Sequence, residues 1–386
     1  MRISDLRGIA VLATQATSGA ARIAEGVHQS VWSTLGVPGG ARPGTTRGIT
    51  GFVYRSVQGV TQLVGKAVDG ALAQLQPLFE LAGQEPPGTP AREAVLAALN
   101  GVMGDRLAAG NNPLATPMRL RHDGAATGKL LVLAHGLCMN DLQWGRQHAD
   151  ALAALGYTPV WLRYNSGLHI SQNGQELSRQ LEQLLGGWPV PVQELAIVAH
   201  SMGGLVARSA CEDAQRNGRR WIGQLAHLVF LGTPHHGAPL ERAGNWVDVL
   251  LGATPYTRPF SRLVQLRSAG ITDLRYGHML ETEWAGHDRF RRTPDRREVL
   301  PLPAGVACYT VAATTAGKRS AVADRLLGDG LVPLRSALGQ HDDPARCLDF
   351  PRDAQWIGYR TGHMALLHHP DVTRQLVRWL SAPAAA

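Results

Sequence analysis

Four short, nearly unbroken apolar runs constrain the fold of this chain more than any other feature of its sequence. They are residues 129–134, 158–162, 195–199 and 228–231, and longer segments with helical patterning separate them. Continuous apolar runs of this length are typical of strands that are buried on both faces of a parallel sheet. Because helical segments alternate with the runs, the sequence predicts a doubly wound, mostly parallel α/β sheet from about residue 115 onward.

Other segments of the same region extend this alternation. Residues 175–185 carry leucines on one side of a helix, at positions 177, 181, 184 and 185. Further strands are predicted from residue 305 through residue 311 and near residues 355–359, and a helical tail at residues 372–380. The fold class is therefore α/β, with helices on both faces of the sheet.

The first hundred residues have a different pattern, in which apolar side chains recur at steps of three and four. The stripe covers residues 9–35, stops at a Pro- and Gly-rich segment and resumes at residues 53–75, so it predicts an αα-hairpin. A third helix is expected to carry Val95, Leu99, Val102 and Met103. We expect a helical extension over residues 1–112, which either packs on the main domain at 113–386 or offers a surface to lipid.

Composition argues against several classes of protein. The formal net charge is +8, but no long basic run is interleaved with aromatic residues, so nucleic-acid binding is not expected. The densest basic patch, residues 287–297, is broken by acids and by Pro294, which favours a solvated face over an anion-binding role. The four cysteines are far apart and lack a CxxC pair, which argues against a disulfide framework and a metal knuckle.

The sequence shows neither a good secretory signal nor a run of 18 apolar residues. We therefore expect a cytoplasmic protein, with peripheral membrane contact through the N-terminal helices as a further option. The oligomeric state is left open.

The segment A-H-S-M-G-G at residues 199–204 is the strongest chemical signal. It follows a buried strand and opens a helical segment, so Ser201 would lie on a tight strand-to-helix turn at the carboxyl edge of the sheet. Ala199 stands where the G-x-S-x-G pattern has its first glycine, and one methyl group is a small departure from it. We predict that Ser201 is a nucleophile; the alternative is a serine that only caps a helix.

The tripeptide H-G-L at residues 135–137 ends the first buried strand. Acyl transfer passes through a tetrahedral oxyanion, which preorganised backbone N–H groups must stabilise. The predicted donors are the N–H groups of Met202, which follows the nucleophile, and of Leu137. His135 is expected to hold this loop in place through its ring.

An acid and a base follow in the order that a serine triad requires. Asp329 lies between two glycines in G-D-G-L-V-P, and His363 follows the last predicted strand in T-G-H-M. His363 is predicted to take the Ser201 proton and to pass it to the leaving group, while Asp329 orients the imidazole. The competing acids and histidines lack the glycine-flanked turn or lie a helical turn later: Asp342, Asp343, Asp349, Asp353, His368 and His369.

The segment G-T-P-H-H-G at residues 232–237 contains two adjacent histidines. Neighbouring side chains diverge, and no Cys or acidic residue is spaced to complete a metal site. We predict that His235 and His236 shape the loop, and that the protein uses no metal and no cofactor.

In this order, the motifs H-G-L, A-H-S-M-G-G, G-T-P-H-x-G and D-G-x-V-P resemble those of the lipase and esterase group of the α/β-hydrolase superfamily. The resemblance covers roughly residues 115–382. It implies a serine hydrolase of carboxylic esters with Ser201, Asp329 and His363 as catalytic triad, and with an oxyanion hole formed by Leu137 and Met202. An ester or lipid small molecule is the implied substrate.

The resemblance also implies a cap over the site, inserted at about residues 240–300, whose apolar side chains would form an acyl pocket. Trp144, Trp246 and Leu250 are the candidate substrate-binding residues. Some lipases of this group bind a structural calcium ion, for which this sequence offers no clear set of ligands. The helical N-terminal third lies outside the resemblance.

Three functions remain open at this stage. A lipase or carboxylesterase would release the acyl group to water, whereas an acyltransferase would pass it from the same acyl-enzyme to another acceptor. Thioesterase and amidase activities would use the same triad. A non-catalytic scaffold for membrane or partner binding is disfavoured, because the fold alone does not require all three triad residues.

Overall fold

The computed structural model describes residues 90–122, 124–238, 267–286, 295, 297–317 and 328–381, and some residues between Ser4 and Thr14. The chain divides into two compact units, the first comprising Met1–Gly88 with Leu107–Ala115 and the second Thr89–Arg106 with Thr116–Ala386. The long helices expected at residues 9–35 and 53–75 lie outside the described residues, except that Ala10, Val11 and Thr14 are helical.

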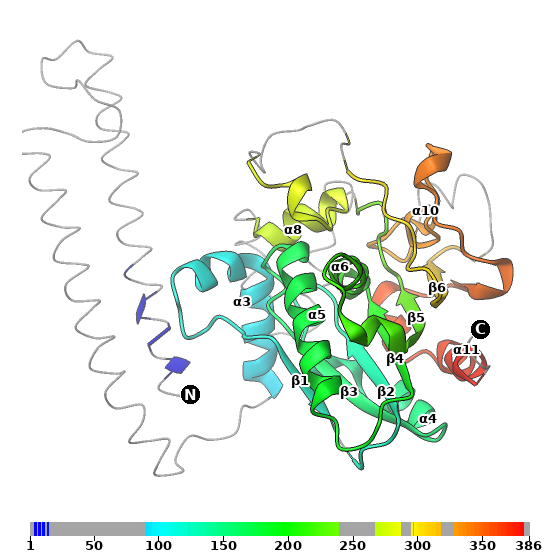
Figure 1. Ribbon diagram of the computed structural model, residues 1–386. Coiled ribbons are helices and arrows are strands. Elements are labelled where there is room, and N and C mark those ends of the chain that lie inside the picture. Colours follow the sequence, from blue (N-terminus) through cyan, green and yellow to red (C-terminus); the bar gives the residue numbers. More distant parts are fainter. Residues whose placement is uncertain are drawn as a thin grey trace, which may run out of the picture. The chain divides into compact units, whose positions relative to one another are not determined.

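The second unit is built on a seven-stranded sheet with the strand order β1-β3-β2-β4-β5-β6-β7 (Figure 1). The strands are β1 (Arg119–His122), β2 (Lys129–Ala134), β3 (Tyr157–Arg163), β4 (Glu194–His200), β5 (Leu225–Leu231), β6 (Ala307–Thr314) and β7 (Gln355–Tyr359). Strand β1 pairs antiparallel with β3, and every other pairing is parallel. The mostly parallel sheet predicted from the apolar runs is confirmed.

Helices cover both faces of the sheet. They are α3 (Pro90–Ala109), α4 (Gln147–Ala153), α5 (Ile170–Gly186), α6 (Met202–Arg216), α8 (Ala269–Tyr276), α10 (Leu334–Ala337) and α11 (Pro370–Leu380). Short 3-10 helices are η1 (Asp141–Trp144), η2 (Arg220–Gln224), η4 (Glu281–Glu283), η5 (Pro344–Arg346), η6 (Arg352–Ala354) and η7 (His363–Leu367). None of the helices in the described residues is long and apolar enough to cross a membrane.

Two hydrophobic clusters show why the central strands are apolar throughout. On one face, Val132 and Ile197 pack with side chains of α5 and α6. On the other face, Leu133 and Val198 pack with side chains of α4 and α11. Successive residues of one strand point to opposite faces, so a strand that is covered on both sides buries every side chain.

The strand order, the antiparallel first strand and the turn that carries Ser201 between β4 and α6 together define the architecture. The chain has the α/β-hydrolase fold. Of the expected cap, the structure describes residues 267–286, 295 and 297–300, which include α8 and η4, and the remainder lies outside the described residues.

Candidate active site

The predicted functional residues gather at one edge of the sheet. Leu137 follows β2, Ser201 follows β4, Asp329 lies between β6 and β7, and His363 follows β7. The carboxyl ends of parallel strands meet at the same edge, where ligands of open α/β sheets bind. The topology therefore brings segments more than 200 residues apart to one site.

The backbone around Ser201 has the geometry of a sharp turn. Ser201 has φ 54° and ψ −125°, a conformation that is costly for a residue with a side chain. A Cβ on Gly203 would lie 2.5 Å from the carbonyl oxygen of His135, and one on Gly204 would lie 2.0 Å from Oγ1 of Thr233. The two glycines after Met202 thus permit the close approach that holds Ser201 at the strand end.

The loop after β2 lies directly against Ser201. A Cβ on Gly136 would be 3.0 Å from Cβ of Ser201 and 3.1 Å from Nδ1 of His200. The structure therefore places Leu137, the next residue, beside the turn that contains Met202. Both predicted oxyanion donors belong to backbone that adjoins Ser201.

His363 and Asp329 form a buried hydrogen-bonded pair. Nδ1 of His363 lies 2.6 Å from Oδ2 of Asp329, and the two residues are 1% and 3% exposed. The other carboxylate oxygen of Asp329 accepts backbone N–H bonds from Leu331 at 3.0 Å and Val332 at 2.8 Å. A carboxylate so fixed accepts the Nδ1 proton, which leaves Nε2 of the neutral imidazole as a proton acceptor.

Nε2 of His363 is buried and has no hydrogen-bond partner among the described residues. An unpaired buried nitrogen costs free energy, and a catalytic role is one explanation for such an atom. The pair therefore presents the lone pair that a general base requires.

The end of β5 lies between Ser201 and the His363–Asp329 pair and contacts both. The Ser201 N–H donates to the carbonyl of Leu231 at 2.8 Å, and the next residue, Gly232, lies beside the pair. A Cβ on Gly232 would lie 3.1 Å from Nδ1 of His363 and 3.2 Å from Oδ2 of Asp329. Glycine is favoured at this position, because a side chain would crowd the pair and because the backbone has φ 58°.

His200, the residue before Ser201, contacts His363. Its Nε2 donates to the carbonyl of His363 at 3.2 Å, and the two rings lie 4.5 Å apart. Burial, together with the neighbouring His363, holds the pKa of His200 well below its ordinary value. His200 therefore stays neutral, so that it adds no positive charge beside a protonated His363.

His135 holds the loop after β2 as the sequence predicts. Its Nε2 accepts the backbone N–H of Tyr164 at 3.2 Å, and its Nδ1 therefore donates to the carbonyl of Gly136 at 2.8 Å. The Tyr164 ring stacks on it at 4.2 Å, and the Tyr164 hydroxyl donates to the carbonyl of His135 at 2.8 Å. Burial lowers the pKa of His135 to about 4, which keeps this neutral arrangement at neutral pH.

Several residues that steady the loop are not among those singled out from the sequence. The Cys138 N–H donates to Oγ of Ser166 at 3.0 Å, and Cys138 has φ 58°. Arg163 binds both Asp141, which follows the loop, and Glu93 of α3. The available signal was the polar segment R-Y-N-S that begins at the carboxyl end of β3.

Of the three candidate substrate-binding residues, the structure describes only Trp144. Trp144 is 1% exposed, and its ring lies 6.4 Å from that of His148 and 6.5 Å from that of His200. Its contribution to substrate binding stays a prediction. Trp246 and Leu250 lie outside the described residues.

Two of the competing residues have other partners. Asp343 accepts the N–H of Ala345 at the start of η5, and His369 accepts the N–H of Asp371 at the start of α11. No group of three His, Cys, Asp or Glu side chains among the described residues is arranged to hold a metal ion. His236 instead bonds the carbonyl of Gly339 through Nε2 at 3.1 Å.

The sequence matches one protein-family model, and the fold is similar to those of solved structures. Residues 110–274 match the model of a domain of unknown function, DUF7379. The fold is similar to that of a mature lipase from Bacillus licheniformis, with 16% identity over 69% of this chain and 99% of that chain at a TM-score of 0.43. An esterase from Pyrococcus furiosus has 13% identity over 68% of this chain and 86% of that chain, at a TM-score of 0.40.

An esterase from Exiguobacterium antarcticum shows 13% identity over 69% of this chain and 96% of that chain, at a TM-score of 0.39. No curated protein matches the sequence. At these identities and TM-scores the likenesses transfer no activity to this chain.

Proposed function

We propose that this protein is a serine hydrolase that cleaves carboxylic esters through an acyl-enzyme on Ser201. The observation that supports this most is the buried pair in which Asp329 accepts the Nδ1 proton of His363 and leaves Nε2 unpartnered. A neutral imidazole in this tautomer, at the sheet edge that also carries Ser201, is suited to general-base catalysis.

In the first half of the reaction, Oγ of Ser201 bonds to the ester carbonyl carbon as its proton moves to Nε2 of His363. The carbonyl oxygen becomes an oxyanion, which the N–H groups of Leu137 and Met202 would stabilise. The bond from the carbonyl carbon to the alcohol oxygen then breaks, and that oxygen takes the proton from Nε2. Asp329 stabilises the imidazolium while it exists.

In the second half, water attacks the acyl-enzyme and gives one proton to Nε2. The bond between the acyl carbon and Oγ breaks, the acid leaves, and the proton returns to Oγ of Ser201. An alcohol or thiol in place of water would make the protein an acyltransferase. A product assay with and without an added alcohol separates the two.

We further propose that residues 240–300 form a cap that contributes the acyl pocket, with Trp144, Trp246 and Leu250 in contact with substrate. Residues 1–112 are proposed to form a helical extension that favours activity on ester at a lipid surface. A chain lacking residues 1–88, which retains α3, should lose more activity on emulsified than on short, soluble esters. Equal losses on both would contradict a surface role.

The test of the reaction is hydrolysis of p-nitrophenyl esters of graded chain length by the full chain. Ser201→Ala should abolish turnover by removing the nucleophile, whereas Ser381→Ala, at the exposed end of α11, should retain it. Full turnover by a folded Ser201→Ala variant would refute the proposed mechanism. A preference across chain lengths would define the acyl pocket.

A further inference from the structure

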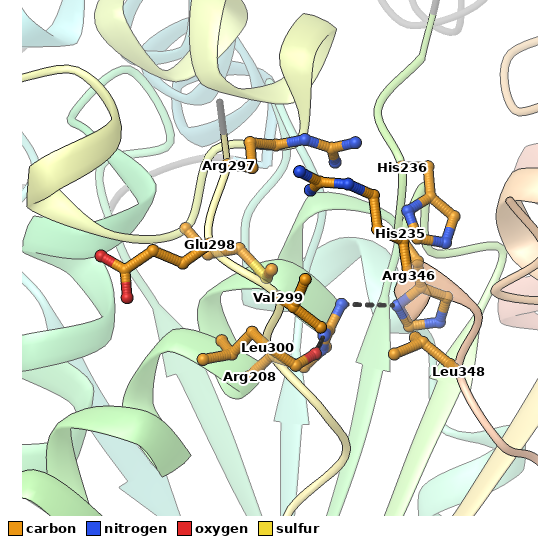
Figure 2. Close-up of a pocket in the computed structure, with 10 residues that line it drawn as sticks. Arg208, His235, His236, Arg297, Glu298, Val299, Leu300, Arg346 and Leu348 are labelled. Atoms are coloured by element: carbon orange, nitrogen blue, oxygen red, sulfur yellow. Dashed lines mark hydrogen bonds between the residues drawn. The ribbon is translucent and has the colours of Figure 1, made fainter. Parts of the chain in front are cut away.

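A second cluster of buried polar side chains lies beside α6, apart from the His363–Asp329 pair. It surrounds a small pocket between α6, the loop after β5 and two later segments (Figure 2). The pocket is lined by Arg208, His235, His236, Met279, Arg297, Glu298, Val299, Leu300, Arg346 and Leu348. The proposed reaction uses none of these side chains.

Arg208 is the central feature of this pocket. It is 3% exposed, donates through Nη2 to the carbonyl of Leu300, and points Nη1 toward Nδ1 of His235 at 3.5 Å. Its Nε is buried and has no hydrogen-bond partner among the described residues. Within that part of the chain no carboxylate forms an ion pair with Arg208 either.

His235 does not supply the missing negative charge. Arginine can only donate, so Nδ1 of His235 faces it as an acceptor and the ring carries its proton on Nε2. Burial and the neighbouring Arg208 hold the pKa of His235 well below its ordinary value. Arg208 thus has a neutral neighbour and remains a buried cation, since its pKa falls only to about 10.

The carboxylates nearby are engaged elsewhere. Asp295 binds Arg297 through both oxygens, at 2.9 and 2.7 Å, and lies 3.8 Å from Nη1 of Arg346. Asp343 lies 3.6 Å from Nε of Arg346. Two carboxylates therefore bind the other two arginines, and no carboxylate of the described residues forms an ion pair with Arg208.

Glu298 also lines the pocket, but its carboxylate is directed away from the other labelled side chains (Figure 2). It accepts from Oγ1 of Thr282 at 2.6 Å and pairs with Arg216 at 3.2 Å, on the exposed side of α6. A buried, unpaired guanidinium is strongly unfavourable, because it loses its hydration without a compensating charge. An anion in the pocket would provide that charge.

We propose that this pocket binds a single monatomic anion, with chloride as the chemical type, as the counter-ion of Arg208. The space open to the centre of a water molecule is about 20 Å³, and one water molecule needs about 10–15 Å³ by that measure. A chloride ion is slightly larger than water and fits this space. The apolar walls from Val299, Leu300 and Leu348 suit a weakly hydrated halide.

The first test compares the melting temperature of the full chain in sodium chloride and in sodium gluconate at equal ionic strength. A ligand that binds only the folded state stabilises it, so chloride should raise the Tm by about 3 °C over gluconate. Arg208→Gln should remove this difference. Arg216→Gln, an arginine that is 51% exposed on the same helix, should keep it.

Equal melting temperatures of the wild type in chloride and gluconate would overturn the proposal. So would an unchanged chloride response in Arg208→Gln, or an equal response to sodium acetate or phosphate, which would indicate a polyatomic site or general screening. The second test is independent of any variant. Crystals of the wild type grown in bromide should show an anomalous peak beside Arg208, and the lack of such a peak would refute the site even if Arg208→Gln does not fold.

Discussion

Two buried histidines, His363 and His235, show how a partner's charge sets the chemistry of an imidazole. Both follow strands of the same sheet, and both are 1% exposed. Nδ1 of His363 donates to a carboxylate, so its Nε2 is a base. Nδ1 of His235 faces a guanidinium, so its Nε2 carries a proton and the ring cannot act as a base there.

Burial alone therefore does not mark a catalytic histidine. Desolvation disfavours the charged form of every buried imidazole. A carboxylate that accepts from Nδ1 lowers the free energy of the imidazolium formed during a reaction. An adjacent cation raises the free energy of the imidazolium.

Replacement of the two histidines should separate their roles. His363→Ala removes the base, and kcat/KM for a p-nitrophenyl ester should fall by about 10⁵- to 10⁶-fold. His235→Gln should leave kcat/KM within about tenfold, although it lowers the Tm because the loop after β5 loses a packed ring. Steady-state kinetics on both folded variants measure these effects. Comparable losses of kcat in the two variants would show that the two histidines do not differ in their catalytic role.

Replacement of the acid should have a smaller effect. Asp329→Asn keeps the shape but no longer fixes the tautomer of His363 or stabilises its imidazolium, so kcat should fall by about 10⁴-fold. Asp343→Asn, which removes an exposed carboxylate near η5, should leave kcat unchanged. A retained wild-type rate in Asp329→Asn would show that another group orients the base.

Acid should destabilise the fold through its buried neutral histidines. Burial lowers the pKa of His135 from 6.5 to about 4. Between these two pH values the unfolded chain binds a proton at His135 and the folded chain does not. This contribution is fully present above pH 6.5 and is lost as the pH falls to about 4; it is worth about 3 kcal/mol. Burial lowers the pKa of His200 in the same direction.

Urea unfolding between pH 7 and pH 4.5 measures this dependence. His135→Gln should be less stable than the wild type at pH 7 but should lose less stability on acidification. An identical pH dependence in both proteins would mean that His135 is not kept neutral by the fold.

The smallest expected effect is a loss of stability on replacement of Tyr164, which contacts His135 in the loop after β2. Tyr164→Phe leaves the buried carbonyl of His135 without its hydroxyl donor, and the free energy of unfolding should fall by about 1–2 kcal/mol. Tyr359→Phe, at a 40% exposed position, provides the control and should change stability little. An unchanged stability in Tyr164→Phe would show that ring stacking alone holds His135.

The sheet could be predicted from the sequence where both faces of a strand are covered, because burial on both faces requires an unbroken apolar run. Strand β1 escaped prediction because R-L-R-H is a polar, mostly exposed edge that only its pairing with β3 makes a strand. Helix α5 begins at Ile170, five residues before the expected start, because its first turn is polar. The local pattern of apolar residues in the sequence reveals neither the pairing of an edge strand nor the polar first turn of a helix.

The candidate site was predictable to the extent that its residues follow strands in a recognisable order. The supporting side chains were not, since Tyr164 lies 29 residues from His135 and Ser166 lies 28 residues from Cys138. The Arg208 pocket was likewise invisible: Arg208 sits in a helical pattern, and its contact at Leu300 is 92 residues away. Whether a charged side chain is buried without a partner depends on the folded structure, so the local sequence does not predict it.

The central claim is that Ser201 is a nucleophile activated by His363. Its most direct test is reaction of the full chain with a fluorophosphonate, followed by mass spectrometry of the labelled peptide and repeated with His363→Ala. We expect one adduct, on Ser201, that forms rapidly in the wild type and far more slowly in the variant. A folded wild type that takes no label, or takes it on another residue, would show that Ser201 is not the nucleophile.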